Sequence, residues 1–407
     1  MQIVNYKLKT AAENLQFSIC NFQFAIRRWY IALLFVIAIL QSSSARALDR
    51  VVFRQGKDAP EQRLFGKLLI KAADGGLLLQ TTDGRLWPIQ PEEIIEHQET
   101  PDAFKALTPA ELAKQLVAEL PGCEVHTTAH YLICHNTSKA YAQWVGALYE
   151  RLYAGFNNFW TRKGIKLRES ETPLVVCVFA DQTSYATYTR PELGEGTKSI
   201  IAYYSLKSNR VAMYDLTGVE ALRQPGDHRG SVQQINAMLA KPEAESMVAT
   251  IIHEATHQIA FNCGLHARFA DIPLWVSEGM AVYFETPDLN SASGWSTIGK
   301  VNPLRLPTFR EYLGGRGESS LESLLADDRR FRDPAQALNA YAEAWALNYY
   351  LLKQHGDAYV AYLKTLSQKG PMVVDDPTAR LKEFKAAFGP DLKKFDGEFV
   401  KQMVKVK

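Results

Sequence analysis

The sequence predicts an α+β fold in which a small amino-terminal β-module precedes a larger domain of strands and helices. Short β-like runs separated by glycine turns occupy residues 51 to 98. Strand-like segments follow between residues 131 and 215, and from residue 244 onward apolar residues recur at helical spacing. Strands followed by helices are typical of α+β proteins, so these three observations indicate the fold class.

Residues 1–47 are predicted to form a signal peptide. Two arginines precede the apolar run from Trp29 to Leu40, which serines and an Ala-Arg-Ala site follow, as in an export signal. The run is shorter than the about 20 apolar residues of a membrane span. We therefore expect a periplasmic or extracellular protein with no stable span after cleavage; a retained amino-terminal anchor is the alternative.

Residues 48–100 are predicted to be the β-module. Asp74-Gly75-Gly76 and Asp83-Gly84 are turn signals between its strands. The expected strands are Val51–Phe53, Leu64–Ile70, Leu77–Thr81 and Leu86–Ile89. This module is either a brace on the larger domain or a binding module, and the absence of an evident aromatic or basic cluster favours the brace.

The larger domain is predicted to span residues 101–407, with strands and helices mixed up to about residue 243. Helices are expected within 101–120, where Thr108-Pro109 provides a start, and within 138–163. The strand candidates are 131–134, 174–180, 200–204 and 210–215. Residues 217–243 are polar, with a short helix expected near Val232, and form either a lid or a solvated insertion.

Four cysteines remain after the signal peptide, and an even number permits disulfides in an exported protein. A hairpin turning at Thr128-Ala129 would place Cys123 opposite Cys134 and allow a bridge between them. The alternative for these two residues, and for Cys177 and Cys263, is a buried free thiol.

The most informative segment is His253-Glu254-Ala255-Thr256-His257, which lies in an apolar stretch of helical periodicity. Residues four apart share one face of a helix, so the two histidines can point at a single metal ion, and imidazole pairs are typical zinc ligands. Glu254 lies about 100° around the helix axis, where its carboxylate can take a proton from a zinc-activated water. The ordinary alternative is a chance match with both histidines in a core.

A third metal ligand is predicted in the next helix, which Pro273 can open. Glu278 lies there within Trp275-Val276-Ser277-Glu278-Gly279, on the side away from the apolar residues. A catalytic zinc takes three protein ligands and keeps one position open. We therefore expect one zinc ion per chain, held by His253, His257 and Glu278, in a hydrolase.

Beyond this helix, the sequence is irregular from 290 to 306 and then predicts helices to the carboxyl end. The expected helices are 321–325, 341–354, 358–366, 377–388 and 392–404. Glu285 is either a carboxylate that orients a ligand histidine or a solvated surface residue.

Composition excludes some partners. The net charge of +2 reflects a near balance of acidic and basic residues, which gives no electrostatic footprint for nucleic acid or for an anionic membrane. The expected partner is a peptide or protein substrate. The sequence does not indicate the number of subunits.

The metal motif together with a downstream W-x-x-E-G-x-A-x-Y pattern resembles the gluzincins, in particular peptidase MA-like proteins related to the aminopeptidase N group. Residues 275–285 are similar along their whole length, and Asn262 follows His257 at the usual spacing. Tyr341 to Leu347 resembles the helix whose Tyr stabilises the transition state. The resemblance covers roughly residues 209–356, and the chain resembles a group of uncharacterised secreted bacterial proteins with this core.

The resemblance implies a zincin, thermolysin-like catalytic domain whose lobes span about 101–243 and 244–407. It makes Glu254 the general base and Tyr341 the oxyanion donor beside the three metal ligands. Tyr341 also fits the ordinary role of a core aromatic residue. The edge strand of the upper lobe, predicted at Arg210 to Asp215, would line the cleft and hold an extended peptide by main-chain hydrogen bonds.

One departure concerns the substrate. The Gly-x-Met-Glu-Asn signature with which aminopeptidases anchor a free amino terminus is missing upstream of His253. We therefore expect an endopeptidase, or a peptidase with another form of end recognition. The alternative from a different class is an exported binding or scaffold protein with a structural or vestigial zinc site.

Overall fold

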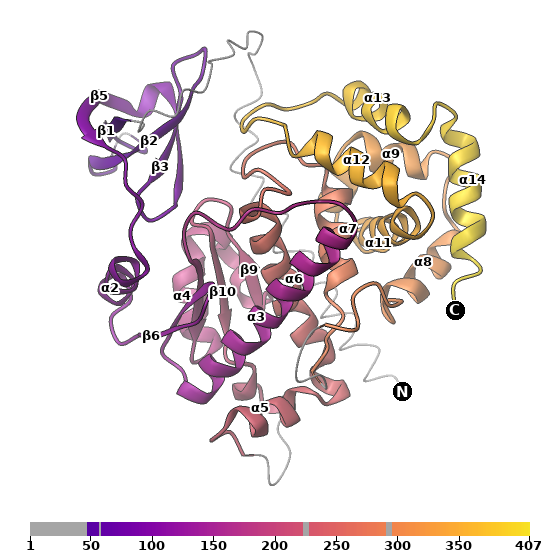
Figure 1. The fold of residues 1–407 in the computed structure, drawn as a ribbon, viewed down its shortest axis with the longest axis horizontal. Helices are drawn as coiled ribbons and strands as arrows, with labels where there is room; N and C mark the ends of the chain where they lie inside the picture. The colour runs from indigo at the N-terminus through magenta and orange to yellow at the C-terminus, as the bar shows by residue number, and fades with distance from the viewer. Residues whose placement is uncertain (1–46, 57, 223–227, 290–294) are drawn as a thin grey trace.

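The computed structural model describes residues 47–56, 58–222, 228–289 and 295–407 (Figure 1). Two five-stranded sheets come first in the sequence, and helices dominate from residue 245 onward. The predicted signal peptide lies outside the described residues, except that Ala47 begins the first strand. Within the described ranges, no helix has the length and apolar character needed to cross a membrane.

The first sheet is antiparallel throughout, in the order β4-β3-β2-β1-β5, and stands apart at one end of the molecule (Figure 1). Its strands are β1 (Ala47–Phe53), β2 (Gln62–Lys71), β3 (Leu77–Thr81), β4 (Leu86–Ile89) and β5 (Ile94–Ala103). It has a core of its own that includes Val51, Phe53 and Leu79. The strands predicted here are confirmed in position.

Strand β5 was missed, and it carries the module past residue 100, where the sequence analysis ended it. The strand lies at an edge of the sheet. None of its residues is buried, and most are exposed. Its sequence, Ile-Ile-Glu-His-Gln-Glu-Thr-Pro-Asp-Ala, therefore shows no apolar alternation from which a strand could be predicted.

The second sheet is mixed, in the order β6-β7-β8-β10-β9, with β7, β8 and β10 parallel. Its strands are β6 (Glu124–Thr127), β7 (Tyr131–His135), β8 (Leu174–Phe179), β9 (Ala202–Tyr204) and β10 (Arg210–Tyr214). The prediction that residues 210–215 form the edge strand is wrong, because β10 pairs with both β8 and β9. The edge strand beside α6 is β9. After α4 the chain returns to the sheet at this edge as β9 and then turns inward to form β10.

Helices cover both faces of this sheet. Strand residues alternate between faces, and the ring of Phe179 contacts those of Tyr185 and Tyr188 of α4, whereas the ring of Tyr131 lies edge-on to that of Tyr149 of α3. One face thus carries α2 (Pro109–Glu119) and α4 (Gln182–Leu193), and the other carries α3 (Lys139–Arg162) and α6 (Glu245–Asn262). Helix α4 was not predicted, whereas α2 and α3 begin after the expected caps, Thr108 and Ser138.

Of the two alternatives for the cysteines, the structure has the buried free thiols and not the bridge between Cys123 and Cys134. Strands β6 and β7 turn around Ala129-His130, one position later than expected, so Cys134 faces Val125. The later turn is fixed by Thr128, whose backbone N–H donates to the carbonyl of Tyr131. Cys123, Cys134, Cys177 and Cys263 are all buried free thiols.

The segment between the second sheet and α6 is partly helical. It contains α5 (Val232–Leu239), as expected near Val232, and residues 223–227 lie outside the described residues. Asn236 accepts a hydrogen bond from the indole of Trp144 and donates to the carbonyl of Leu289. This helix therefore packs against the body of the molecule, and its role as a lid stays a prediction.

The carboxyl-terminal half is a group of helices around α7 and α11 (Figure 1). It consists of α7 (Leu274–Phe284), α8 (Arg305–Leu313), α9 (Ser320–Ala326), α10 (Arg329–Arg332), α11 (Ala337–Gln354), α12 (Gly356–Leu366), α13 (Pro377–Phe388) and α14 (Leu392–Met403). The short 3-10 turns are η2 (Pro91–Glu93), η3 (Gly194–Lys198), η4 (Leu216–Gly218), η5 (Glu220–Leu222) and η6 (Pro242–Ala244). Helices α8 and α10 were not predicted.

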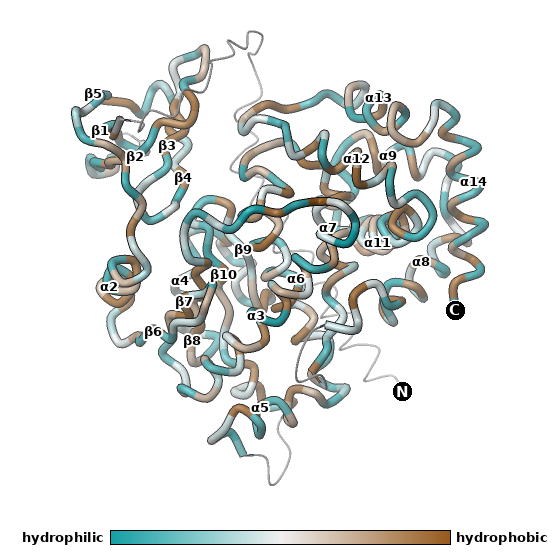
Figure 2. The backbone as a smooth tube through the Cα atoms, in the orientation of Figure 1, coloured by the Kyte–Doolittle hydropathy of each residue, from teal (hydrophilic) through white to brown (hydrophobic). Residues whose placement is uncertain are grey.

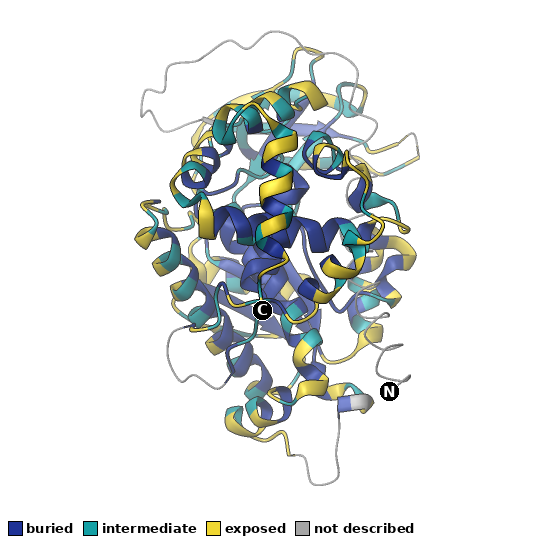
Figure 3. Cartoon of the chain, turned by 90° about the vertical axis from the view of Figure 1, so that its right-hand side faces the viewer, coloured by how far each residue is buried: buried dark blue, intermediate teal, exposed yellow. Residues whose placement is uncertain are grey.

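The distribution of buried residues follows the arrangement of inner and outer elements. Apolar segments concentrate along the inner helices and strands, whereas the outer helices alternate between apolar and polar residues (Figure 2). Buried residues accordingly fill the centre of the molecule, and exposed ones lie on its outer helices (Figure 3). Every residue of α7 is buried, which places this helix, with α6 beside it, at the centre of the fold.

Candidate metal centre

Helix α6 presents two histidines to its neighbour α7. Val248, Ile251 and Ile252 are fully buried in the core, and Gly264, at φ +84°, follows the end of the helix, where glycine is typical. His253 and His257 are four residues apart, and their rings lie with centroids 4.7 Å apart. The four-residue spacing therefore places both imidazoles on the face of α6 that is directed at α7.

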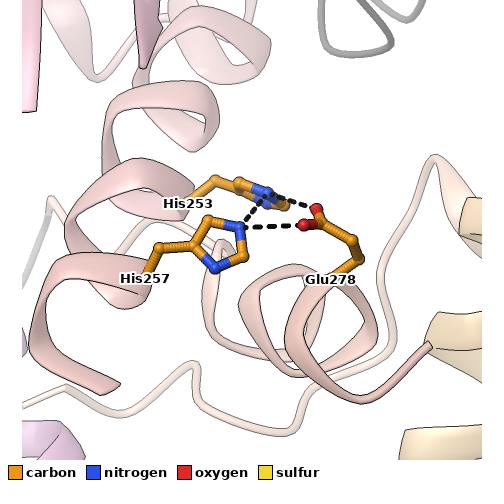
Figure 4. Close-up of side chains that lie close together, drawn as sticks. All are labelled: His253, His257 and Glu278. Carbon is orange, nitrogen blue, oxygen red and sulfur yellow. Dashed lines mark hydrogen bonds and ion pairs between the residues drawn. The ribbon is translucent and has the colours of Figure 1, made fainter. Parts of the chain in front are cut away.

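Helix α7 supplies the third group. Pro273 precedes its first turn, and Glu278 points at both histidines (Figure 4). Its Oε2 lies 3.2 Å from Nε2 of His253, its Oε1 lies 3.4 Å from Nε2 of His257, and the two Nε2 atoms are 3.1 Å apart. These three residues form a cluster that could hold a metal ion.

A second carboxylate contacts His253 on the side of the ring opposite Glu278. Glu285, at the end of α7, lies with Oε2 2.9 Å from Nδ1 of His253. Asn302 donates a hydrogen bond of 2.9 Å to the other oxygen of Glu285. Glu285 is therefore a buried partner of a ligand histidine and not a surface residue, which resolves the two roles that the sequence left open.

The pKa of His253 depends on the two carboxylates that flank its ring, those of Glu278 and Glu285. Burial alone would lower the pKa of His253, but hydrogen bonds with Glu278 and Glu285 outweigh it and raise the pKa to about 10. Burial would raise the pKa of Glu278, but the charge of His257 and the hydrogen bond from His253 lower it to about 2. The two carboxylates thus favour the protonated form of His253, with which a metal ion has to compete.

Glu254 occupies the adjoining face of α6 and is held by the second sheet. The backbone N–H of Tyr204, in edge strand β9, donates a 2.7 Å hydrogen bond to Oε2 of Glu254. Burial raises the pKa of Glu254 more than the neighbouring histidines lower it. A carboxylate with a raised pKa is a better proton acceptor, as a general base requires.

Tyr341 is buried in α11, with 1% of its surface exposed. Its ring lies edge-on to Phe331 at 5.3 Å and 5.6 Å from the guanidinium of Arg305, which is itself 3.9 Å from Glu285. These contacts place Tyr341 on the side of the site where Glu285 supports His253. Its role as an oxyanion donor stays a prediction.

The structure adds residues that sequence reasoning missed. Tyr204 lies in a segment that was predicted to be a strand, but nothing local indicates which way its N–H points. Asn302 falls in an irregular Ser- and Gly-rich stretch without a periodic signal. Asn262, singled out by its spacing, bonds to Asn209 at the start of β10, with amide distances of 2.7 and 2.8 Å.

Comparison with known proteins finds one similarity, which covers the part of the chain that contains the site. The sequence model of the family described as protein of unknown function (DUF1570) matches residues 247–373. The match begins in α6 and includes both histidines, Glu278 and Tyr341. No curated protein matches the chain.

Proposed function

We propose that this protein is a zinc-dependent peptidase that hydrolyses peptide bonds with Glu254 as general base. The observation that carries the proposal is the convergence of two imidazoles and one carboxylate, with Glu254 on the next face of the same helix. Two His and one Glu are an established ligand set of catalytic zinc, which keeps a further position open. The family match is compatible with this role but names no activity.

The spacing of the three groups supports zinc. Ligand atoms about 2.0–2.1 Å from a tetrahedral zinc ion lie roughly 3.3 Å from one another. The two Nε2 atoms are 3.1 Å apart, and the two oxygens of Glu278 face one histidine each, with Oε2 3.2 Å from Nε2 of His253 and Oε1 3.4 Å from Nε2 of His257. The residues therefore fit a tetrahedral ion with little movement, and when bound such an ion would supply Lewis acidity and an acidified water.

The proton transfers belong to Glu254. The N–H of Tyr204 holds Oε2 of this carboxylate, so Oε1 is the oxygen that takes the proton of the attacking water. Glu254 then returns the proton to the nitrogen of the leaving amine. Tyr341 is the proposed donor to the negative oxygen that develops on the substrate carbonyl.

Strand β9 is the proposed place for an extended substrate, in place of the edge strand expected from the sequence. The N–H of Ser205 bonds to the carbonyl of Arg210, so the N–H of Tyr204, one residue earlier, points away from the sheet. Ala202 and Tyr204 thus direct main-chain groups to the rim that adjoins α6. The N–H of Tyr204 is taken by Glu254, so the groups proposed to pair with a peptide backbone are the carbonyl of Tyr204 and the main-chain groups of Ala202.

The competing role is a binding or scaffold protein with a structural zinc site. Structural sites are usually closed by four protein ligands, whereas the described residues bring together three. A buried carboxylate held beside the ligands has no purpose in a structural site. Both features favour hydrolysis.

The test compares wild type with Glu254→Gln and His253→Ala. Metal content is measured by mass spectrometry, and cleavage is measured on a peptide library with and without chelator. We expect one zinc per chain in wild type and Glu254→Gln, with cleavage reduced by at least about 100-fold in the latter. His253→Ala should lose both metal and cleavage.

The outcomes separate the two roles. Turnover retained in pure Glu254→Gln protein would contradict the assignment of the base. Stoichiometric zinc in wild type without chelator-sensitive cleavage of any library member would favour the structural site.

A further inference from the structure

The β-module contacts the larger domain through the turn between β3 and β4 and the first residues of β4. This turn, residues 82–85 between β3 and β4, lies against the hairpin that joins β9 to β10. Arg268, in the loop after α6, donates a 2.9 Å hydrogen bond to the carbonyl of Gly84 and a 3.3 Å bond to that of Leu206. One guanidinium therefore joins the two turns.

Further contacts follow the same line. The N–H of Leu86 donates to the carbonyl of Lys207 at 2.8 Å, and the ammonium of Lys207 lies 4.5 Å from the ring centre of Trp87. Glu119 of α2 pairs with Arg85 of the module turn and also, at 2.8 Å, with Arg210 of β10. The hairpin is thus held to the module by backbone, cation–π and ionic contacts.

The other side of the hairpin is fixed to the metal helix. Gln258 of α6 donates to the carbonyl of Asn209 at 2.9 Å, and Asn209 accepts a 2.7 Å bond from the hydroxyl of Tyr204. Tyr204 then reaches Glu254 through its backbone N–H. A continuous set of contacts therefore runs from the module turn, through residues 204–210, to the proposed base.

From these contacts we infer that the β-module is a positioning element of the proposed catalytic site. It holds the β9–β10 hairpin against α6 and so keeps the N–H of Tyr204 on Oε2 of Glu254. Arg268 and Lys207 are positioning residues, since they act through Tyr204. The expected effect of the module on turnover rests on the proposed function. Its expected effect on the amide of Tyr204 does not.

The test uses the full mature chain with Arg268→Met, which keeps the apolar stem and removes the donors. Hydrogen-exchange mass spectrometry of overlapping peptides across residues 200–206 follows the Tyr204 amide, and Glu254→Ala identifies the protection that Glu254 provides. Lys207→Met is a milder second variant for the case that Arg268→Met does not fold. Arg50→Met, which breaks the Arg50–Glu96 ion pair inside the module, is the matched control.

We expect Tyr204 exchange to accelerate about tenfold in Arg268→Met and in Glu254→Ala, but not in Arg50→Met. Zinc content should be unchanged in Arg268→Met, and kcat on a cleaved peptide should fall about tenfold while KM changes little. Added guanidinium ion should partly restore turnover in Arg268→Ala. This rescue would not occur if the residue only stabilised the fold.

Two outcomes test the positioning role of the β-module separately from the proposed peptidase activity. Unchanged Tyr204 exchange in Arg268→Met, or in Lys207→Met if the first variant does not fold, would overturn the inference. Accelerated exchange in a protein that cleaves no peptide would uphold the positioning role and count against the peptidase.

Discussion

At the scale of single residues, the metal centre depends on side chains whose charges are set by what surrounds them. His253 lies between two carboxylates, Glu278 in front and Glu285 behind. The rear carboxylate fixes the orientation of the ring and increases its basicity, as a partner of a metal-bound histidine does. The same local field makes metal uptake a competition with a proton.

Substitution of Glu285 by Gln should weaken zinc binding. The amide removes a negative charge beside His253, and loss of such a partner typically lowers metal affinity by about 10–100-fold. A chelator competition titration measures the change. Glu311→Gln, at an exposed position of α8, should bind zinc as wild type does, and equal affinities in both variants would show that Glu285 does not support the ligand.

His266 should make the fold sensitive to acid. The side chain is 1% exposed, its Nε2 lacks a hydrogen-bond partner in the described part of the chain, and burial lowers its pKa to about 3. Below pH 6.5 the unfolded chain binds a proton at this residue and the folded chain does not. Stability is therefore lost as the pH falls from 6.5 toward 3.

Urea unfolding at pH 7 and pH 5 measures this loss. Wild type should lose about 2 kcal/mol more than His266→Phe between these values, at ~1.4 kcal/mol per pH unit. His228→Gln, at an exposed position, should retain the full loss. An identical pH dependence in wild type and His266→Phe would exclude the buried neutral histidine as its cause.

At the scale of elements, the site is a contact between two helices backed by a third. Helix α11 packs closely on α7, and the amide of Asn348 in α11 donates to the carbonyl of Trp275 in α7 at 2.7 Å. This approach is close because α7 has Gly279 at the interface. The residue next to a metal ligand thus sets the distance between helices.

Gly279→Ala should destabilise the protein and displace Glu278. A Cβ at this position would collide with the amide of Asn348 and lie 2.5 Å from the carbonyl oxygen of Ala344. Overpacking of this kind costs about 1–3 kcal/mol, and we expect zinc affinity to fall with it. Urea unfolding and chelator titration measure the two effects.

Gly397→Ala is the matched control. It lies inside helix α14, with nothing within 4 Å of the added Cβ, so the protein should gain about 0.5–1 kcal/mol. Similar behaviour of the two variants would mean that Gly279 has room for a side chain.

At the scale of the whole molecule, the three proposed metal ligands lie where its parts meet. Helix α6 covers the second sheet, whereas α7 belongs to the helical half and packs on α11. The β-module reaches the same region through the β9–β10 hairpin (Figure 1). An ion held by α6 and α7 therefore links two large portions of the chain.

Zinc should accordingly stabilise the folded protein as a whole. An ion at 100 times its dissociation constant adds about 2.7 kcal/mol when it binds the folded state alone. Thermal unfolding with zinc and with excess chelator measures the difference, and His253→Ala should show none. A response of His253→Ala equal to that of wild type would place the binding of zinc elsewhere.

The sequence by itself determined the parts of this protein that depend on local periodicity. The i, i+4 histidines and the apolar stripe beside them predict α6, and Pro273 with the segment around Glu278 predicts α7, because a helix repeats the same geometry at every turn. Those features suffice to predict the three side chains of the cluster and to single out Glu254 beside them. The structure brings the three ligands together.

Only the tertiary structure decided which strand forms the rim, where Glu285 points and what holds Glu254. The hydrogen bond from Tyr204 to Glu254 and the bonds from Arg268 to the carbonyls of Leu206 and Gly84 join residues 50 or more positions apart. The order β8-β10-β9 places β9 at the edge of the sheet. The one-residue shift of the β6–β7 turn likewise moved Cys134 opposite Val125. Contacts between distant segments follow from packing that no local pattern encodes, and in a hairpin a shift of the turn by one residue changes every partner.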